Sequence, residues 1–468
     1  MMKKVIFFFI ALLIITITNT YSQTEGSSFK AGAFSTTYLT DYQSLGVNPA
    51  NLGWQREDKS VHLSFLEFGL SVFSDAIPKT ELREEFITKL MSEDEFTLQE
   101  KIEAASNFLS HGLALNLDIA LFSFSFQNEA FGGVGFSVRE KTVADFKFND
   151  KLASFLFLGA FDSSLFTKFI NPTDSTLLGI PNKNTLYSEV FEDARMSMNS
   201  YLEFVFGYGR KLVDNDMLKL YAGIDFKYLK GLAIADMGTV DGEFRAYTAL
   251  SPRFNIEYPQ DVITGSPSYT EEGLFVGKGF GVDLGVTVEI QNLKAAIAVN
   301  DIGSITWDGN VINASDDFLD TIEFTGFDNY NLVWEAQKIW EGDGVFQWHG
   351  EEKKKVNLPT NVRLGASYTF IEKFEIGMDV YIPASNEPGS FENAVFGFGA
   401  NIKPIPWVEL SAGFVGGGIT DYSIPAGICF SVAKNSWETG VSTRDILTWL
   451  KQTSPHLSAS FGFLRFRF

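Results

Sequence analysis

The sequence predicts an all-β protein: a transmembrane antiparallel β-barrel of about 14 strands, with an N-terminal plug segment and partly helical extracellular loops. Three observations predict this fold. The chain starts with an export signal, it ends in an alternating aromatic strand, and between these ends long and short connections alternate without a break.

The C-terminal strand has the pattern that a closing barrel strand needs. The chain ends Phe461-Gly-Phe-Leu-Arg-Phe-Arg-Phe468, so a period of two places Phe466 and Phe468 on one face, with Arg465 and Arg467 on the other. Such a strand shows apolar side chains to lipid and polar ones to the lumen. A terminal Phe resembles the signal that the barrel-assembly machinery reads. This resemblance implies the role of an assembly signal for Phe466 and Phe468. An edge strand of a soluble sandwich is the alternative.

The N-terminus predicts a secretory signal peptide over residues 1–22. Lys3 and Lys4 precede an apolar run over 5–17, and small residues surround the expected cleavage after Ser22. The apolar run is too short to span a membrane as a helix. We therefore expect an exported protein that lies in the outer membrane, in contact with its lipids.

Composition agrees with a barrel and excludes some functions. The 46 Phe suit a lipid-facing wall, and the 41 Gly ease crowding in the lumen. Cys429, the single cysteine, has no partner for an intrachain disulfide. Cleavage after Ser22 removes two of the 37 basic residues and leaves all 58 acidic ones. The mature chain is therefore strongly acidic, which argues against nucleic acid as a partner.

Several spanning segments show the alternation clearly, including 218–228, 280–290 and 374–382. The charged positions of these segments and of the last strand are expected to line the lumen: Asp225, Asp283, Glu289, Asp379, Arg465 and Arg467. They are either a selectivity lining or a hydrogen-bonded wall that Lys219, Lys227, Arg363 and Arg465 balance.

The connections fix the strand number. Six are short: 127–129, 213–215, 291–292, 371–373, 403–406 and 434–435. Seven are longer: about 75–111, 148–199, 231–278, 302–356, 383–390, 416–421 and 443–455. Thirteen connections give fourteen strands, with both chain ends on the short-turn side, which is periplasmic in outer-membrane barrels.

The long connections carry predicted local structure. Residues 80–109 are expected to form two short helices, the second starting with a capping box of Ser92 and Glu95. The stretch 152–170 is rich in aromatic residues. Phe155, Phe157 and Phe161 are either a hydrophobic lip that collects apolar ligands or the small core of a folded loop.

Residues 23–59 precede the barrel, which we place at 60–468, and are expected to plug or gate its lumen. Asn48-Pro49 favours a turn, Gly53 permits unusual backbone angles and Trp54 is available as an anchor. The predicted gate is the motif Asn48, Pro49, Ala50, Asn51, Gly53 and Trp54.

This motif carries a resemblance to known barrels. It is similar to the opening of FadL-like fatty-acid transporters and of PorV-like barrels. The segments 277–285, 301–307, 358–360 and 437–445 look like an uncharacterised, domain-of-unknown-function family of barrels from Bacteroidota. The resemblance implies location and architecture, and it implies no assigned activity.

Three functions stay open. The first is a FadL-like channel or transporter for small hydrophobic or amphipathic molecules. The second is a PorV-like scaffold that docks secretion, motility or surface proteins. The third is an outer-membrane hydrolase, which we expect least, because none of the four His lies in a nucleophile motif and no Gly-x-Ser-x-Gly is present. We expect no catalytic residue, metal or cofactor.

Overall fold

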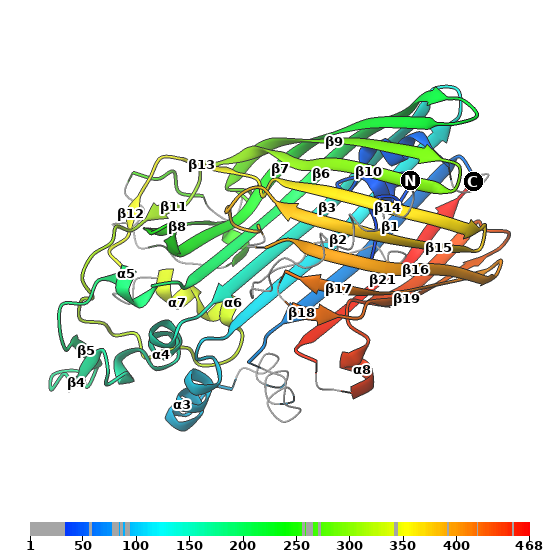
Figure 1. Cartoon of the computed structure of the whole chain (residues 1–468). Helices are drawn as coiled ribbons and strands as arrows, with labels where there is room; N and C mark the ends of the chain where they lie inside the picture. Colours follow the sequence, from blue (N-terminus) through cyan, green and yellow to red (C-terminus); the bar gives the residue numbers. More distant parts are fainter. Residues whose placement is uncertain are drawn as a thin grey trace.

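A computed structural model gives the fold (Figure 1). It describes residues 33–55, 59–76, 84, 88, 94–254, 258, 265–269, 273–340, 345–390, 393–418, 420–451 and 454–468. The predicted signal peptide lies outside the described residues. Among these residues, no helix has the length and apolar character needed to cross a membrane.

Fourteen antiparallel strands form a closed barrel, as predicted. In barrel order they are β1 (Val61–Phe73), β2 (Gly112–Asn128), β3 (Gly132–Lys147), β6 (Arg195–Asp214), β7 (Lys219–Val240), β9 (Gly277–Ile290), β10 (Leu293–Trp307), β14 (Asn361–Ile371), β15 (Phe374–Pro383), β16 (Val395–Ile405), β17 (Val408–Gly417), β19 (Ala426–Val432), β20 (Trp437–Thr443) and β21 (His456–Arg467). The last strand pairs with the first, and His62 lies opposite Arg467. Closure leaves no free sheet edge, which a lipid environment requires.

The barrel wall is apolar outside and polar inside. On its outer surface a row of phenylalanines crosses four neighbouring strands, with ring centres 5.3 Å apart for Phe65 and Phe122, 6.1 Å for Phe122 and Phe136, and 4.7 Å for Phe136 and Phe206. Inward positions hold buried charged residues such as Asp225 and Lys227. This inside-out distribution is that of a membrane barrel, because hydrocarbon solvates only the outer face.

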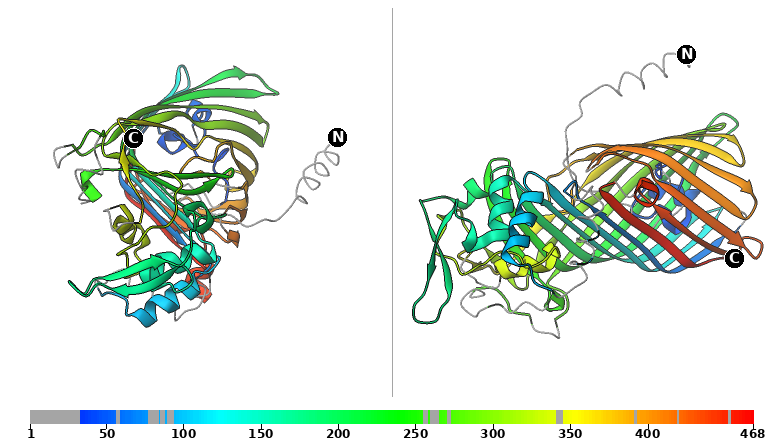
Figure 2. Two further views of the ribbon diagram at one scale, coloured as in Figure 1. Left: turned by 90° about the vertical axis from the view of Figure 1, so that its left-hand side faces the viewer. Right: turned by 90° about the horizontal axis from the view of Figure 1, so that it is seen from below.

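The wall is tall on one side and low on the other. β6 and β7 have 20 and 22 residues, whereas β19 and β20 have seven each. All the short turns lie at one end of the barrel, and the long connections gather at the other end (Figure 2).

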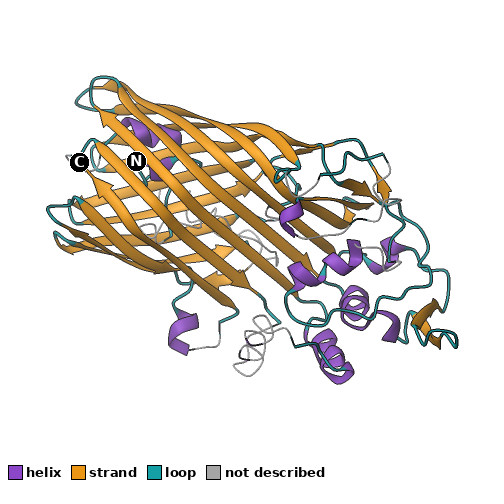
Figure 3. Cartoon of the chain, turned by 180° about the vertical axis from the view of Figure 1, so that it is seen from behind, coloured by secondary structure: helices purple, strands orange, loops and turns teal. Residues whose placement is uncertain are grey.

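The long connections fold into an outer cap. Its helices and 3-10 turns are α3 (Leu98–Asn107), α4 (Asp150–Leu158), η3 (Gly159–Phe161), α5 (Tyr187–Val190), η4 (Pro252–Phe254), α6 (Leu332–Glu335), α7 (Gln337–Trp340) and α8 (Leu447–Lys451). Its short strands are β4 (Phe166–Ile170), β5 (Leu177–Pro181), β8 (Glu243–Leu250), β11 (Val311–Asn313), β12 (His349–Gly350), β13 (Lys354–Asn357) and β18 (Thr420–Ser423). Figure 3 shows most helices at this end of the barrel.

Two predicted loop features can be compared with the structure. The capping box of α3 is formed by Thr97 and Glu100, whereas Ser92 of the predicted box lies outside the described residues. Phe155 and Phe157 are 1% and 0% exposed, so they belong to the core of the cap and not to a ligand-collecting lip. Of the three residues only Phe161 reaches the surface, where Lys168 lies 5.0 Å from its ring centre. The physical reason is that the cap is large enough to bury its own apolar residues.

Candidate functional site

The site lies inside the barrel, where residues 33–55 form what we call the lumen segment. It contains two 3-10 turns, η1 (Asp41–Ser44) and η2 (Pro49–Gly53), and nearly all its side chains are buried. Both turns lie within the ring of strands in Figure 3.

Glycines on the inner wall form a seat for the lumen segment. A Cβ atom built on any of these glycines would lie between 1.9 and 3.2 Å from an atom of the segment: Gly133, Gly135, Gly207, Gly209, Gly223, Gly285, Gly365, Gly377, Gly397 and Gly399. Real Cβ contacts are longer than most of these distances, so almost any larger side chain would push the segment away. The glycines of the seat come from seven strands between β3 and β16.

Polar contacts fix the segment on this seat. The backbone N–H groups of Ser35 and Thr36 donate to Asp379 Oδ2 at 2.6 and 2.9 Å. The N–H of Gly46 donates to Asp225 Oδ2 at 2.9 Å, and Asn48 Nδ2 donates to Thr287 Oγ1 at 2.8 Å. Two of the predicted lumen-lining carboxylates therefore bind backbone donors of the segment.

The motif Asn48–Trp54 holds the second turn together. Asn48 Oδ1 caps the turn by accepting from Ala50 N at 3.2 Å, and Pro49 occupies the first position after the cap. Asn51 Nδ2 donates to the carbonyl of Leu39 at 2.7 Å, while its Oδ1 accepts from Trp54 Nε1 at 3.1 Å. Gly53 packs on the backbone of Arg210, and Lys294 lies 3.6 Å from the ring centre of Trp54.

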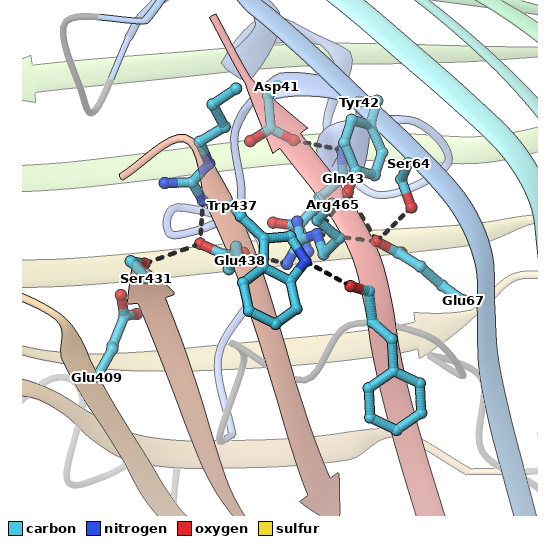
Figure 4. A network of polar contacts seen from close by, with 12 residues as sticks. Asp41, Tyr42, Gln43, Ser64, Glu67, Glu409, Ser431, Trp437, Glu438 and Arg465 are labelled. Atoms are coloured by element: carbon cyan, nitrogen blue, oxygen red, sulfur yellow. Dashed lines mark hydrogen bonds and ion pairs between the residues drawn. The ribbon is translucent and has the colours of Figure 1, made fainter. Parts of the chain in front are cut away.

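Tyr42 ties the segment to the seam where the barrel closes (Figure 4). Its hydroxyl donates to Glu67 Oε1 on β1 at 2.7 Å and accepts from Arg465 Nε on β21 at 2.5 Å. Glu67 also pairs with Arg465 at 2.9 Å, and Glu438 on β20 pairs with both Arg465 and Arg467. Each of these charged side chains is buried and has a partner of opposite charge, as buried charges require.

The remaining lumen-lining carboxylates are also engaged. Asp283 Oδ2 lies 2.9 Å from Lys227 Nζ, which pairs with Asp301 as well. Glu289 pairs with Lys219 at 2.8 Å, nearer the short turns. All six predicted side chains point inward, and their contacts match a hydrogen-bonded wall better than a row of charges that face passing solute.

The lumen segment separates two spaces. On the long-connection side lies a cavity of about 70 Å³, here called the chamber, to which the segment contributes Leu39, Gln43, Gly46 and Val47. On the short-turn side lies an open vestibule of about 670 Å³, to which it contributes Leu52, Gly53, Trp54 and Gln55. The barrel wall of the chamber carries charged and amide side chains: Glu67, Asn116, Asp118, Arg139, Lys141, Asn199, Asp301, Asn361 and Arg363.

A serine–histidine pair on the wall bears on the hydrolase hypothesis. Ser71 Oγ and His456 Nε2 lie 2.7 Å apart on the paired strands β1 and β21. His456 Nδ1 has no hydrogen-bond partner among the described residues, so no carboxylate orients the ring as a triad requires. Neither residue lines the chamber or the vestibule.

Sequence reasoning did not identify Tyr42, Glu67, Glu438 or the glycine seat as parts of the site. Tyr42, Glu67 and Glu438 gain meaning only from contacts across the barrel. The seat did leave a signal, because Gly133 and Gly135, and likewise Gly207 and Gly209, repeat with the period of one strand face.

The chain is similar to one protein family and to several solved structures. A family model described as a family of unknown function, DUF5723, matches residues 79–415. No curated protein matches the sequence. Among solved structures, the chain is similar to a mutant of the monoaromatic hydrocarbon channel TodX at 13% identity, with a TM-score of 0.46 and coverage of 95% of this chain and 98% of that one.

Two further structures are similar at lower scores. The toluene transporter TodX of Pseudomonas putida has 12% identity, a TM-score of 0.43 and coverage of 96% and 99%. A FadL homologue of Pseudomonas aeruginosa has 8% identity, a TM-score of 0.38 and coverage of 96% and 97%.

Proposed function

The chain belongs to the DUF5723 family, and we propose that its barrel is a gated outer-membrane channel for small amphipathic molecules, with the lumen segment as the gate. One observation carries the proposal: the same short segment lines the chamber with one part and the vestibule with the next. Its displacement would join the two spaces into a passage.

The nature of the contacts supports a movable gate. The segment rests on glycines, which present no side chain that would interlock with it, and is held by hydrogen bonds, while its apolar residues such as Leu45 and Leu52 are buried against the wall. Individual hydrogen bonds contribute only about 0.5–1.5 kcal/mol each to stability, so no single bond fixes the segment on its seat. A barrel of fourteen strands is wide enough to conduct once a plug leaves, since about eight strands already fill with side chains and about 16–18 leave a channel.

The lining narrows the expected range of solutes. The chamber wall is charged and polar, so it favours molecules with a polar group over hydrocarbons. Docking of surface or secretion proteins remains the second hypothesis from the sequence. No specific observation in the structure favours it.

A tether across the gate tests the proposal. Asn48 and Thr287 are in hydrogen-bond contact, so cysteines at both positions, in a Cys429→Ser background, can be cross-linked with a short thiol reagent. Proteoliposomes in isosmotic arabinose should swell more slowly after cross-linking, and a cleavable reagent should restore the rate. Equal swelling of tethered and untethered barrels would contradict a gate at this segment. Either single cysteine variant with the same reagent is the control.

A further inference from the structure

Helix α8 lies at the point where the barrel wall is lowest. β19 and β20 have seven residues each. At a rise of about 3.3 Å per residue and a tilt of about 40°, a strand of this length covers a height of about 18 Å, whereas the apolar band of an outer-membrane barrel is about 25 Å tall. The short turns share one end of the barrel, so the missing height is on the long-connection side, where α8 follows β20.

The helix exposes apolar side chains away from the barrel. α8 lies outside the ring of strands in Figures 1 and 2. Trp449 and Leu450 are 56% and 71% exposed. Single exposed apolar residues are ordinary at a protein surface, but two adjacent ones of this size at the edge of a lipid-facing wall indicate contact with an apolar phase.

Hydrogen bonds at its start and on its inner side fix the helix in this orientation. Asp445 Oδ1 accepts from the N–H of Leu447 at 3.2 Å, which caps the first turn. The hydroxyl of Thr448 donates to the carbonyl of His456 on β21, and Thr448 is buried. The helix therefore turns the side of Thr448 toward the wall, and the exposed Trp449 stays outside.

The exposed surface of α8 is continuous with the apolar face of the low wall. Trp449 Nε1 donates at 3.2 Å to the hydroxyl of Thr443, the last residue of β20. On the same strand Val441 is half-exposed. Tyr422 of β18 is also half-exposed, and it stacks on Phe414 of β17 with ring centres 6.0 Å apart. The medium that covers these wall residues, which is lipid, therefore also reaches the helix.

The chemistry of the exposed side suits the boundary between acyl chains and headgroups. Trp449 combines a large apolar ring with one N–H group, and such side chains favour this boundary. Leu450 adds apolar surface, and Lys451, the exposed last residue of α8, adds a cation that can reach headgroup phosphates. A short helix with this composition is expected to lie in the plane of the membrane surface.

We propose that α8 anchors the low wall in the lipid boundary on the long-connection side, with Trp449 and Leu450 inserted among the acyl chains. The occupant is membrane lipid, because the helix stands where the wall falls short of the apolar band and its surface continues that of the wall. The proposal does not depend on the channel function, since a barrel that never opens needs the same lipid contact.

Depth-dependent fluorescence quenching tests the proposal. An environment-sensitive fluorophore is attached to Leu450→Cys in a Cys429→Ser background, and the full-length barrel is reconstituted into phosphatidylcholine vesicles. The lipids carry a nitroxide either near the headgroup or near the chain end, and iodide is the quencher in water. We expect the headgroup-proximal nitroxide to quench the probe at least about twofold more strongly than the chain-end nitroxide, and iodide to quench it weakly.

Two matched positions calibrate the measurement. Ile170→Cys labels an equally exposed apolar position on β4 of the outer cap, and we expect iodide alone to quench it. Phe398→Cys labels the outer face of β16, and we expect the chain-end nitroxide to quench it at least as strongly as the other nitroxide. Trp449→Cys is a second position on α8 that should repeat the result of Leu450→Cys, and it replaces that variant if the heat-modifiable band is lost.

Two results would overturn the proposal. A probe on α8 that iodide quenches as strongly as it quenches the Ile170 probe would place the helix in water. A probe shielded from iodide and insensitive to both nitroxides would show that a second copy of the protein covers the helix instead of lipid. Neither result would affect the proposed gate, which the swelling experiment tests separately.

Discussion

Tyr42 and Arg465 lie 423 positions apart in the sequence and are joined by a hydrogen bond of 2.5 Å from the Arg465 Nε to the Tyr42 hydroxyl. The contact links the lumen segment to the last strand, and Glu67 extends it to the first strand. One phenol therefore connects the lumen segment with the seam at which the barrel closes.

Tyr42→Phe should loosen the lumen segment without unfolding the barrel. The substitution removes one hydroxyl that serves a buried carboxylate and a buried guanidinium, at a cost of about 1–3 kcal/mol. Hydrogen exchange at residues 33–55 should speed up, while exchange in β6 and β7 stays slow. Tyr422→Phe, at a half-exposed position outside the lumen, is the control. Unchanged exchange in the segment would refute the role of this contact.

Gly223→Ala should displace the segment more strongly. The new Cβ would lie 2.3 Å from the Pro49 carbonyl atoms, which belong to backbone and cannot rotate away. Overpacking of this kind costs about 1–3 kcal/mol. Gly281→Ala is the matched control, because its nearest neighbour is the end of the flexible Leu358 side chain. Protease cleavage within 33–55 should rise for the first variant only; equal cleavage of the two would show that the seat is not needed.

The sequence predicted the wall well and the contacts across the lumen poorly, for a physical reason. A strand that separates lipid from water must alternate, so the strands and turns could be identified from segments such as 280–290. Contacts such as those of Tyr42 join residues far apart, and no local pattern encodes them. The Ser92 and Glu95 spacing fits a capping box as well as Thr97 and Glu100 do, so the spacing alone does not locate the start of the helix.

Acid should loosen the outer cap. Asp328 is partly buried, which opposes its charged form, but hydrogen bonds from Lys101 and Lys338 hold the pKa of this carboxyl below its usual value. Because the pKa is lower in the folded state, the charged carboxyl stabilises the folded cap at every pH above the ordinary carboxyl pKa of about 3.9. This stabilisation is lost as the pH falls through the lower pKa of the folded state. Proteolysis of α3 should therefore increase in that acidic range.

Asp328→Asn separates this ion pair from general acid effects. The variant should already show the faster cleavage of α3 at neutral pH, whereas Asp320→Asn, whose exposed carboxylate accepts from the neighbouring Thr321 N–H, should not. Parent-like cleavage in Asp328→Asn at neutral pH would contradict the assignment.

The final strand should matter for assembly beyond its apolar area. Phe466→Ala with Phe468→Ala removes two outward aromatics at the closing seam, where the N–H of Phe468 donates to the carbonyl of Val61 at 2.9 Å. We expect little folded barrel from this double variant. Phe396→Ala with Phe398→Ala removes similar outward groups in mid-wall and should assemble normally. Equal yields of heat-modifiable protein would show that the terminal aromatics have no special role.

Deletion of residues 24–55 tests the central claim most directly, because it removes the partition between chamber and vestibule and keeps every barrel strand. The measurement is single-channel conductance in planar bilayers, on protein first shown to be folded by heat-modifiability. We predict a large, stable conductance for the deletion variant and a closed or rarely open parent. Equal conductance of the two barrels would contradict the gate.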